Sequence, residues 1–414
     1  MKTPCRTDQR ESPDMGPSPH YKRNLAVLWF GNFFTGIGLS LVVPFLPLFI
    51  DTLGEFSRQE LALYCGIIIA APFLMQVIVS PMWGRLADRK GRKIMLLRAA
   101  LGMSVFMAAT GFATNVWILL VVRAVFGVFS GFMSNSVALI AVQVPRSKSG
   151  KVMGILNTSN VSGQLLGPIF GGTVVSIIGY SNMFLITGSI LFVVFITILL
   201  FVREDFTPVE KGEESSLKQI FAKIDKPQII YSMFLTTLLL RLSFSSINPI
   251  LSLYVRDILP AGGNVEFYSG IVAAAPGLTT IIAAPFLGAL SDRVGTNRVL
   301  MASLLMLFVA LLPMAFVTAV WQIIVLRLLI GAISAALMPS VQSILVRNTP
   351  REATSRVFAY NQSAQSFGML IGPLVGAAVS GAFDIRYVFY VPAVLTLFNM
   401  LVFARVNLTD KKPS

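Results

Sequence analysis

The chain has 414 residues, of which 55% are hydrophobic and only 13% are charged, and its mean hydropathy is +0.75. A soluble protein carries roughly a quarter charged residues, so a soluble globular fold is excluded. The formal charge of +14 does not come as a basic patch interleaved with aromatic residues, so no nucleic-acid partner is expected.

The apolar residues lie in runs of roughly 20 residues, the length that a helix needs to cross about 30 Å of hydrocarbon. Runs of that length lack the alternation of a transmembrane β-barrel. The sequence therefore predicts an all-α polytopic membrane protein. Twelve spans are expected, at about 24–49, 61–83, 94–113, 116–142, 150–177, 181–202, 229–255, 267–289, 299–318, 320–344, 357–380 and 385–405.

The basic residues predict the orientation of these spans. Of the 33 Lys and Arg residues, 27 fall in the tails and loops on one side of a twelve-span chain, and only Arg58, Arg256 and Arg386 fall on the other. The positive-inside rule then places both termini in the cytoplasm. No apolar leader precedes the first span, so the polar N-terminal residues are predicted to form a disordered cytoplasmic tail.

An internal repeat divides the chain into two halves. Four landmarks return in the same order 204 or 205 positions later: the segment 40–48, the basic segment 84–93, the Trp117 to Gly127 pattern and the Gly163 to Gly171 pattern. Parallel repeats of this kind are typical of carriers that rock around a site near the midplane. The predicted domains are a tail 1–23, a six-helix bundle 24–202, a cytoplasmic inter-bundle loop 203–228, a six-helix bundle 229–405 and a tail 406–414.

The segment GRLADRKGRK at 84–93 resembles the loop 2–3 signature of the major facilitator superfamily, and GALSDRVG at 288–295 is its weaker copy. Its glycines are expected to allow a tight turn, and Asp88 to accept hydrogen bonds from a helix N-terminus or a neighbouring Arg. We expect a lock between cytoplasmic helix ends; the alternative is a solvated basic loop. The lock residues would be Gly84, Asp88, Arg89, Gly91, Arg92, Gly288, Asp292 and Arg293.

A glycine pattern in the fifth span resembles the antiporter signature of drug exporters in this superfamily. It consists of Gly154, Gly163, Gly167, Pro168, Gly171 and Gly172. Glycines four residues apart let two helices approach closely, and proline bends a helix; tight packing alone would give the same pattern. With the first-span segment 39–47 and the fourth-span Arg123, the resemblance is to the twelve-span drug/proton antiporter family of bacteria.

This resemblance implies the major facilitator fold of two six-helix bundles in the bacterial inner membrane. It implies a monomer that exports small amphipathic drugs by alternating access, driven by the proton motive force, with no other cofactor and no metal. A carrier for a sugar or another metabolite is the first rival, although uptake carriers are not expected to show the complete fifth-span signature. A membrane enzyme or sensor is the second; the spans carry no catalytic triad, metal cluster or paired carboxylates, and no soluble sensory domain is appended.

Three arginines lie inside the predicted spans. An ionisable residue there indicates a functional site. Arg241 falls near the midplane and is expected to face a water-filled cavity, whereas Arg123 and Arg327 lie roughly 10 Å from the outer end and could also extend to the interface. No Asp or Glu falls near a span centre, so proton coupling is expected to use Asp88, the outer-side group Asp51, Glu55 and Glu60, or titration of the substrate itself. The resemblance to the antiporter family adds Arg123, whose counterpart there is proposed to assist proton movement.

Uncharged polar residues mark the fifth, seventh and eleventh spans. They either hold helices together or line the substrate cavity. With Arg241, they form the predicted substrate cavity: Asn157, Asn160, Gln164, Asn248, Asn361, Gln362 and Gln365. A cationic side chain without a carboxylate nearby predicts a preference for neutral, zwitterionic or anionic substrates.

Overall fold

A computed structural model describes residues 20–144, 146–204, 227–260, 262–350 and 354–410. Most of the predicted tail 1–23 and of the loop 203–228 lies outside these residues. At the other end, the last helix continues to Asp410, beyond the predicted boundary at 405. Among the described residues, every regular element is a helix.

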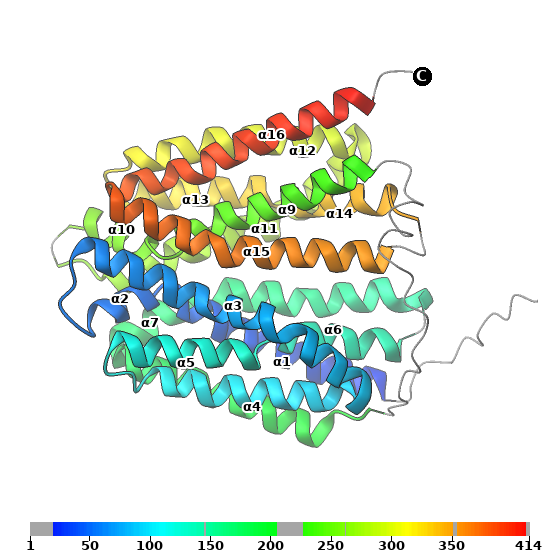
Figure 1. The fold of residues 1–414 in the computed structure, drawn as a ribbon, viewed down its shortest axis with the longest axis horizontal. Helices are drawn as coiled ribbons and strands as arrows, with labels where there is room; N and C mark the ends of the chain where they lie inside the picture. The colour runs from blue at the N-terminus through cyan, green and yellow to red at the C-terminus, as the bar shows by residue number, and fades with distance from the viewer. Residues whose placement is uncertain (1–19, 145, 205–226, 261, 351–353, 411–414) are drawn as a thin grey trace, which may run out of the picture.

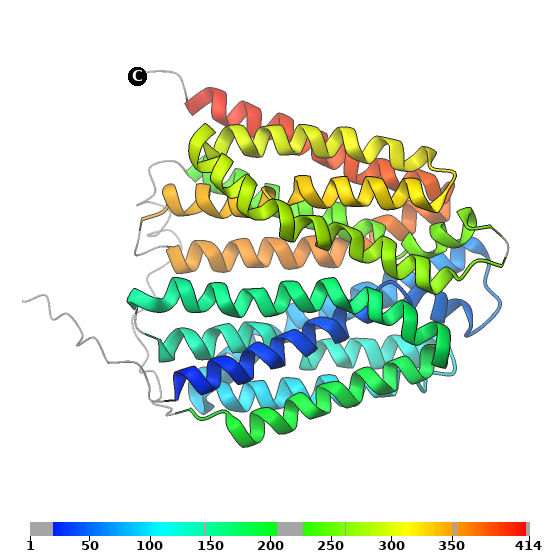
Figure 2. The same ribbon diagram turned by 180° about the vertical axis from the view of Figure 1, so that it is seen from behind.

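The helices form two groups that lie side by side, with their axes roughly along the longest dimension of the molecule (Figure 1). Figure 2 shows the same division from behind. The first group contains α1 Tyr21–Val42, α2 Leu46–Asp51, α3 Arg58–Lys90, α4 Arg92–Thr110, α5 Val116–Phe129, α6 Phe132–Gln143 and α7 Arg146–Phe201. The second contains α9 Pro227–Ile247, α10 Leu251–Ile258, α11 Val265–Val294, α12 Thr296–Leu311, α13 Val320–Ser334, α14 Leu337–Arg347, α15 Thr354–Ala382 and α16 Tyr390–Asp410, with the short 3₁₀ helices η1 Leu312–Phe316 and η2 Ile385–Phe389.

The described chain begins and ends on one side of the molecule, which we call the inner side. The opposite side, where α2 and α10 lie, is the outer side (left in Figure 1). Eleven described helical stretches are long and apolar enough to cross a membrane, and one of them, α7, is two helices merged across Gly179, whose φ of 77° only glycine adopts readily. The total of twelve spans and their orientation stay predictions.

Several spans are interrupted, and the interruptions repeat between the halves. The first span breaks at Val43-Pro44-Phe45 and the seventh at Asn248-Pro249-Ile250, because proline removes a backbone donor and restricts the residue before it. Between α5 and α6, Gly131 has a φ of 111°. These breaks give α2 and α10 as short separate pieces at the outer ends of α1 and α9.

The most extensive contacts between the two halves are those of α7 with α11 and of α3 with α15, and α2 also contacts α10. Glycines allow the approach, since a Cβ at Gly270 would meet the carbonyl of Pro168 and one at Gly66 would meet Ala377. These contacts start at the outer ends and reach Gly277, about 17 Å farther in than Glu266 at 1.5 Å per residue. The halves therefore touch in the outer part of the molecule.

Candidate functional site

The basic segment 84–93 is mostly helix and not a loop. The helix α3 continues through Lys90, and the chain turns only at Gly91, where φ is 92° and ψ is 163°. In the second half, Gly295 turns in the same way with a φ of 100°. The expectation that Gly84 and Gly288 permit the turn is therefore wrong: both lie inside helices, and a Cβ at either would meet nothing within 4 Å.

A carboxylate caps the helix N-terminus next to this turn, and it belongs to Glu204. Its two oxygens accept hydrogen bonds from the backbone N–H groups of Arg92, at 2.9 Å, and Lys93, at 2.7 Å. The side chain of Asp88 is outside the described part of the structure, whereas Asp292 is exposed. The predicted lock stays a prediction, as do the roles of Arg89, which is exposed, Arg92, which is half-buried, and Arg293, which is exposed.

A second polar cluster ties the inner ends of three helices together around Asn24, which is fully buried. Its amide donates to the Gln143 side chain at 2.9 Å and to the Arg203 carbonyl at 2.6 Å, and accepts from the Arg203 N–H at 3.1 Å. Together with Glu204, these contacts hold the inner ends of α1, α4, α6 and α7 in one unit. This cluster could not be predicted from the sequence, because each member stands alone in its own segment.

Arg98 holds the break in the fourth span. Its guanidinium donates to the carbonyls of Val128, at 3.3 Å, and Ser130, at 3.1 Å, and the indole of Trp83 also donates to Val128, at 2.9 Å. Arg98 is one of the 27 basic residues assigned from the sequence to the tails and loops, and that assignment is wrong for it, because it lies inside α4 and is half-buried. Its position inside the predicted span 94–113 was the available signal.

The antiporter pattern divides into two faces and one outlier. Gly163, Gly167 and Gly171 face α1, where added Cβ atoms would meet the backbone or side chains of Phe33, Ser40 and Leu41. Pro168 and Gly172 face α11 of the other half. Gly154 faces open space. The pattern thus places α7 against both halves at once, and α15 has the same position through Gly368, Gly372 and Gly376 against α9 and through Pro373 against α3.

The two repeated arginines are buried, with 6% of Arg123 and 8% of Arg327 exposed. They do not extend to the outer surface. The Nε of Arg327 donates to the carbonyl of Val272 at 3.2 Å, whereas the Nε and one terminal nitrogen of Arg123 have no hydrogen-bond partner among the described residues. The Arg123 guanidinium lies 5.1 Å from the centre of the Phe126 ring. Arg123 is therefore the more poorly satisfied of the pair.

The predicted amides divide by exposure. Asn361 is buried and accepts a hydrogen bond from Thr237 at 2.7 Å, which makes it a contact between α15 and α9. Gln164 is exposed and donates to Asn160 at 2.6 Å. The remaining amides are exposed or half-buried: Asn157, Asn248, Gln362 and Gln365.

The accessible amides of α7 and α15 lie just inward of the contacts between the halves. On α7, Asn157, Asn160 and Gln164 precede Leu165, which packs against Gly277. On α15, Gln362 precedes Pro373, which packs against Gly66. An amide facing lipid would lack partners, so this placement favours a polar site between the halves.

Arg241 lies on α9 beside this region and is half-buried. Its Cβ packs close to Gly368 of α15, and its Nε is buried with no hydrogen-bond partner among the described residues. No described bond joins Arg241 to the amides of α7 or α15. The structure brings this arginine to the α9–α15 contact, where it has a donor available for a further acceptor.

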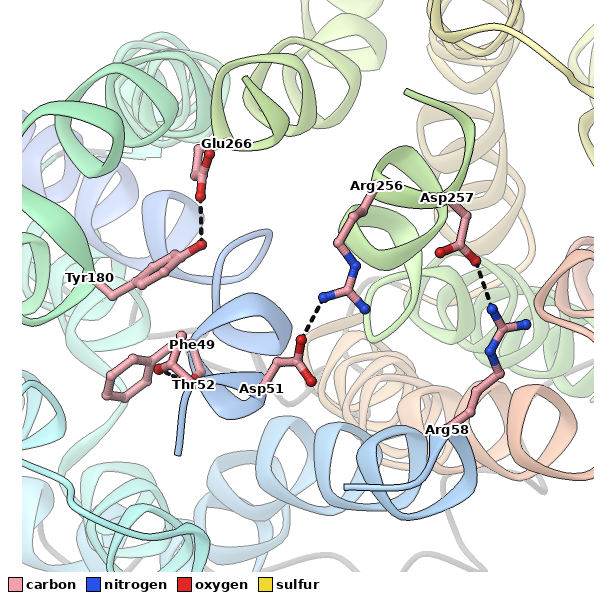
Figure 3. A network of polar contacts seen from close by, with 8 residues as sticks. All are labelled: Phe49, Asp51, Thr52, Arg58, Tyr180, Arg256, Asp257 and Glu266. Carbon is pink, nitrogen blue, oxygen red and sulfur yellow. Dashed lines mark hydrogen bonds and ion pairs between the residues drawn. The ribbon is translucent and has the colours of Figure 1, made fainter. Parts of the chain in front are cut away.

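At the outer side, polar contacts join the two halves (Figure 3). Asp51 and Arg256 form an ion pair, and so do Arg58 and Asp257, at 3.2 Å. The hydroxyl of Tyr180 donates to Glu266 at 2.8 Å. Sequence reasoning treated Arg58 and Arg256 only as outer charges and did not foresee their partners.

Comparison with known proteins decides the family. A sequence model described as the Major Facilitator Superfamily matches residues 28–262 and 233–414. The chain belongs to the Major Facilitator Superfamily. It is a membrane transporter of this superfamily, and its similarity to the bacterial proteins described next identifies it as a multi-pass protein of the bacterial inner membrane.

Curated relatives of this superfamily match nearly the whole chain. The multidrug resistance protein MdtG of Rahnella sp. (strain Y9602) is 46% identical over 388 residues, which cover 94% of each chain. MdtG of Salmonella heidelberg (strain SL476) is 45% identical over 390 residues, covering 94% of this chain and 96% of that one. The resemblance predicted from the motifs is confirmed at the level of the family.

Solved structures of the superfamily share the fold. A bacterial homologue of the human lysosomal transporter Spinster, in an inward-facing and occupied conformation, gives a TM-score of 0.78 at 14% identity and covers 96% of this chain and 100% of that one. The human organic anion transporter MFSD10 gives a TM-score of 0.67 at 18% identity, covering 93% and 100%. The predicted fold class is confirmed as an all-helical major facilitator fold.

Proposed function

We propose that this protein exports small amphipathic drugs from the bacterial cytoplasm, driven by inward flow of protons. The observation that carries the proposal is the 46% identity, over 94% of both chains, to relatives described as multidrug resistance proteins. The contact of α7 with both halves supports it, because the antiporter pattern then lies where the two halves move against each other. Twelve spans, cytoplasmic termini and a monomer belong to the same proposal.

Export is tested in inverted membrane vesicles from a bacterial host that lacks its own drug exporters. With a proton gradient imposed, drugs are expected to accumulate inside the vesicles, and an uncoupler is expected to abolish the accumulation. A panel of sugars and other metabolites runs in parallel. Accumulation of a sugar without any drug, or accumulation that survives the uncoupler, contradicts the proposal.

The substrate preference follows from Arg241. A half-buried guanidinium with an unused donor attracts an anionic or polar acceptor and repels a permanent cation. We expect Arg241→Gln to reduce export of anionic drugs at least about tenfold, as loss of one charged hydrogen bond does, while ethidium export stays unchanged. Efficient ethidium export by the unaltered protein, with anionic export intact in Arg241→Gln, contradicts this preference.

The proton carrier is proposed among Asp51, Asp88 and Arg123. A carboxylate can carry a proton directly, so Asp51→Asn and Asp88→Asn are the first variants to compare, with Arg123→Gln as the third. The variant that lacks the carrier is expected to move drug down its concentration gradient but not to respond to the proton gradient. If all three variants keep full gradient-driven accumulation, the carrier lies elsewhere in the chain.

A further inference from the structure

The ion pair between Asp51 and Arg256 joins residues that are 205 positions apart. This separation is the offset of the internal repeat, so the two residues occupy equivalent positions in the two halves. Two halves related by a pseudo-twofold axis can bring equivalent residues together only next to that axis. The ion pair therefore marks the axis at the outer side of the molecule.

The elements that carry the pair obey the same relationship. The helices α2 and α10 begin at Leu46 and Leu251, again 205 positions apart, and they contact each other across the halves. Each is separated from its long helix by a proline-containing break, Val43-Pro44-Phe45 or Asn248-Pro249-Ile250. Such breaks let a short piece reorient without bending the long helix behind it.

Two further contacts flank the central pair (Figure 3). Arg58, at the start of α3, pairs with Asp257 of α10, and Tyr180, in the second part of α7, donates to Glu266 of α11. Each contact crosses from one half to the other. All three contacts lie at the outer side.

These contacts are weak enough to break and re-form in each transport cycle. The side chains of Asp51 and Arg256 are 33% and 40% exposed, and that of Arg58 is 64% exposed. Exposed ion pairs of this kind shift an equilibrium by up to about fivefold each. The two ion pairs, together with the Tyr180–Glu266 hydrogen bond, bias the closed state without fixing it.

We propose that α2 and α10 form the outer gate of this transporter, and that the Asp51–Arg256 pair is its central latch. The inference rests on the proposed alternating access and adds the residues that hold its outer side closed. Separation of the pair accompanies opening of the outer side, and re-formation accompanies opening of the inner side. Asp51 and Arg256 act here as positioning residues.

The protein carries its own reporter of this gate. Cys65 of α3 is fully buried and lies about one helical turn inward of Leu61, which lines the cavity beside the two ion pairs. A second reporter position is Ala62, which is 3% exposed, borders the cavity of about 180 Å³ beside the two ion pairs, and packs 4.0 Å from the position of a Cβ on Gly381. Thiols at both positions are shielded while the outer side is closed.

The test measures how fast a membrane-impermeant maleimide, added outside intact cells, labels Cys65 in a Cys5→Ser background. We expect Asp51→Asn and Arg256→Gln to raise the labelling rate by up to about fivefold each. The exchanged double variant Asp51→Arg/Arg256→Asp is expected to return it toward the parental rate. Arg386→Gln removes an exposed outer charge that is not part of the gate and is the matched control.

Two outcomes overturn the latch: labelling at the parental rate in both neutralised variants, or labelling in the exchanged variant as fast as in the single ones. The same set of variants is repeated with Ala62→Cys in a Cys5→Ser/Cys65→Ser background. A change in labelling rate at Cys65 that does not occur at position 62 also counts against the gate. Labelling needs neither drug nor proton gradient. If labelling follows the expected order while no drug is exported, the gate stands and the proposed export function fails.

Discussion

The guanidinium carbon of Arg98 lies 3.9 Å from the centre of the Trp83 indole ring, a cation–π contact between α3 and α4. From this position Arg98 donates to the carbonyls of Val128 and Ser130, which the break between α5 and α6 leaves without helical partners. One side chain thus joins three spans: it donates to the carbonyl of Ser130 and shares the carbonyl of Val128 with the indole of Trp83.

Replacement of Arg98 by Ala is expected to destabilise the protein by about 1–3 kcal/mol, because the carbonyl of Ser130 loses its side-chain donor and that of Val128 keeps only the Trp83 indole. Arg98→Lys should recover little of the loss, since an ammonium cannot reach two carbonyls and stack on the indole at once. Thermal unfolding in detergent measures both. The control is Arg85→Ala, a change at an exposed arginine one turn from Arg89. If Arg98→Lys keeps full stability, the simultaneous contact of the guanidinium with two carbonyls and the indole is not what stabilises the protein.

Glu204→Ala is expected to destabilise the inner end of α4 by about 0.5–2 kcal/mol, the usual effect of losing a helix cap. The carboxylate accepts from two backbone N–H groups, at Arg92 and Lys93, and also opposes the positive end of the helix dipole. Glu204→Gln keeps an acceptor oxygen and should lose less. Amide hydrogen exchange at Arg92 and Lys93 reports the effect locally; exchange unchanged in Glu204→Ala would refute the cap.

Gly376→Ala should be far more damaging than Gly154→Ala, although Gly154 belongs to the antiporter pattern and Gly376 to the copy of that pattern in the second half. An added Cβ at Gly376 would overlap the carbonyl oxygen of Ser246, whereas one at Gly154 would meet nothing. Overpacking of this kind destabilises by about 1–3 kcal/mol. Unfolding temperatures of the two variants decide the matter, and equal losses would show that the helix contact is not the cause.

Thr237→Val is expected to lower stability by about 1–3 kcal/mol without changing the range of exported drugs. Valine has nearly the same shape, so the main change is that the buried oxygen of Asn361 loses its donor. The opposite result is expected for Gln362→Leu, at an exposed amide of the same helix: stability changes little and export changes. Drug accumulation and unfolding, measured on both variants, separate structural amides from substrate-contacting ones.

The sequence predicted the positions of the spans because burial in a membrane leaves a signal in every residue of a helix. The expected span 61–83 lies within α3, and 267–289 lies within α11. The sequence predicts a continuous span at 116–142, whereas the structure divides it into α5 and α6. The break at Ser130 and Gly131 changes the backbone without changing the hydropathy. Two spans predicted as separate, 150–177 and 181–202, are joined by a single glycine turn at Gly179.

The candidate site was only partly predictable, because hydropathy and spacing do not report tertiary partners. The repeat offset did place α7 and α15 in equivalent positions, and it singled out Arg123 and Arg327. In contrast, nothing in the sequence indicated that Glu204 would cap α4. Likewise, Asn361 matched the polar pattern of its neighbours although its side chain serves a helix contact.

The outer ion pair also constrains how the gene arose. In an assembly of two identical half-length chains, each residue on the symmetry axis faces its own copy, so aspartate would meet aspartate and arginine would meet arginine. Such like charges repel, and an attractive pair at equivalent positions requires the two copies to differ. The Asp51–Arg256 pair therefore became possible only after the duplicated halves had diverged in sequence.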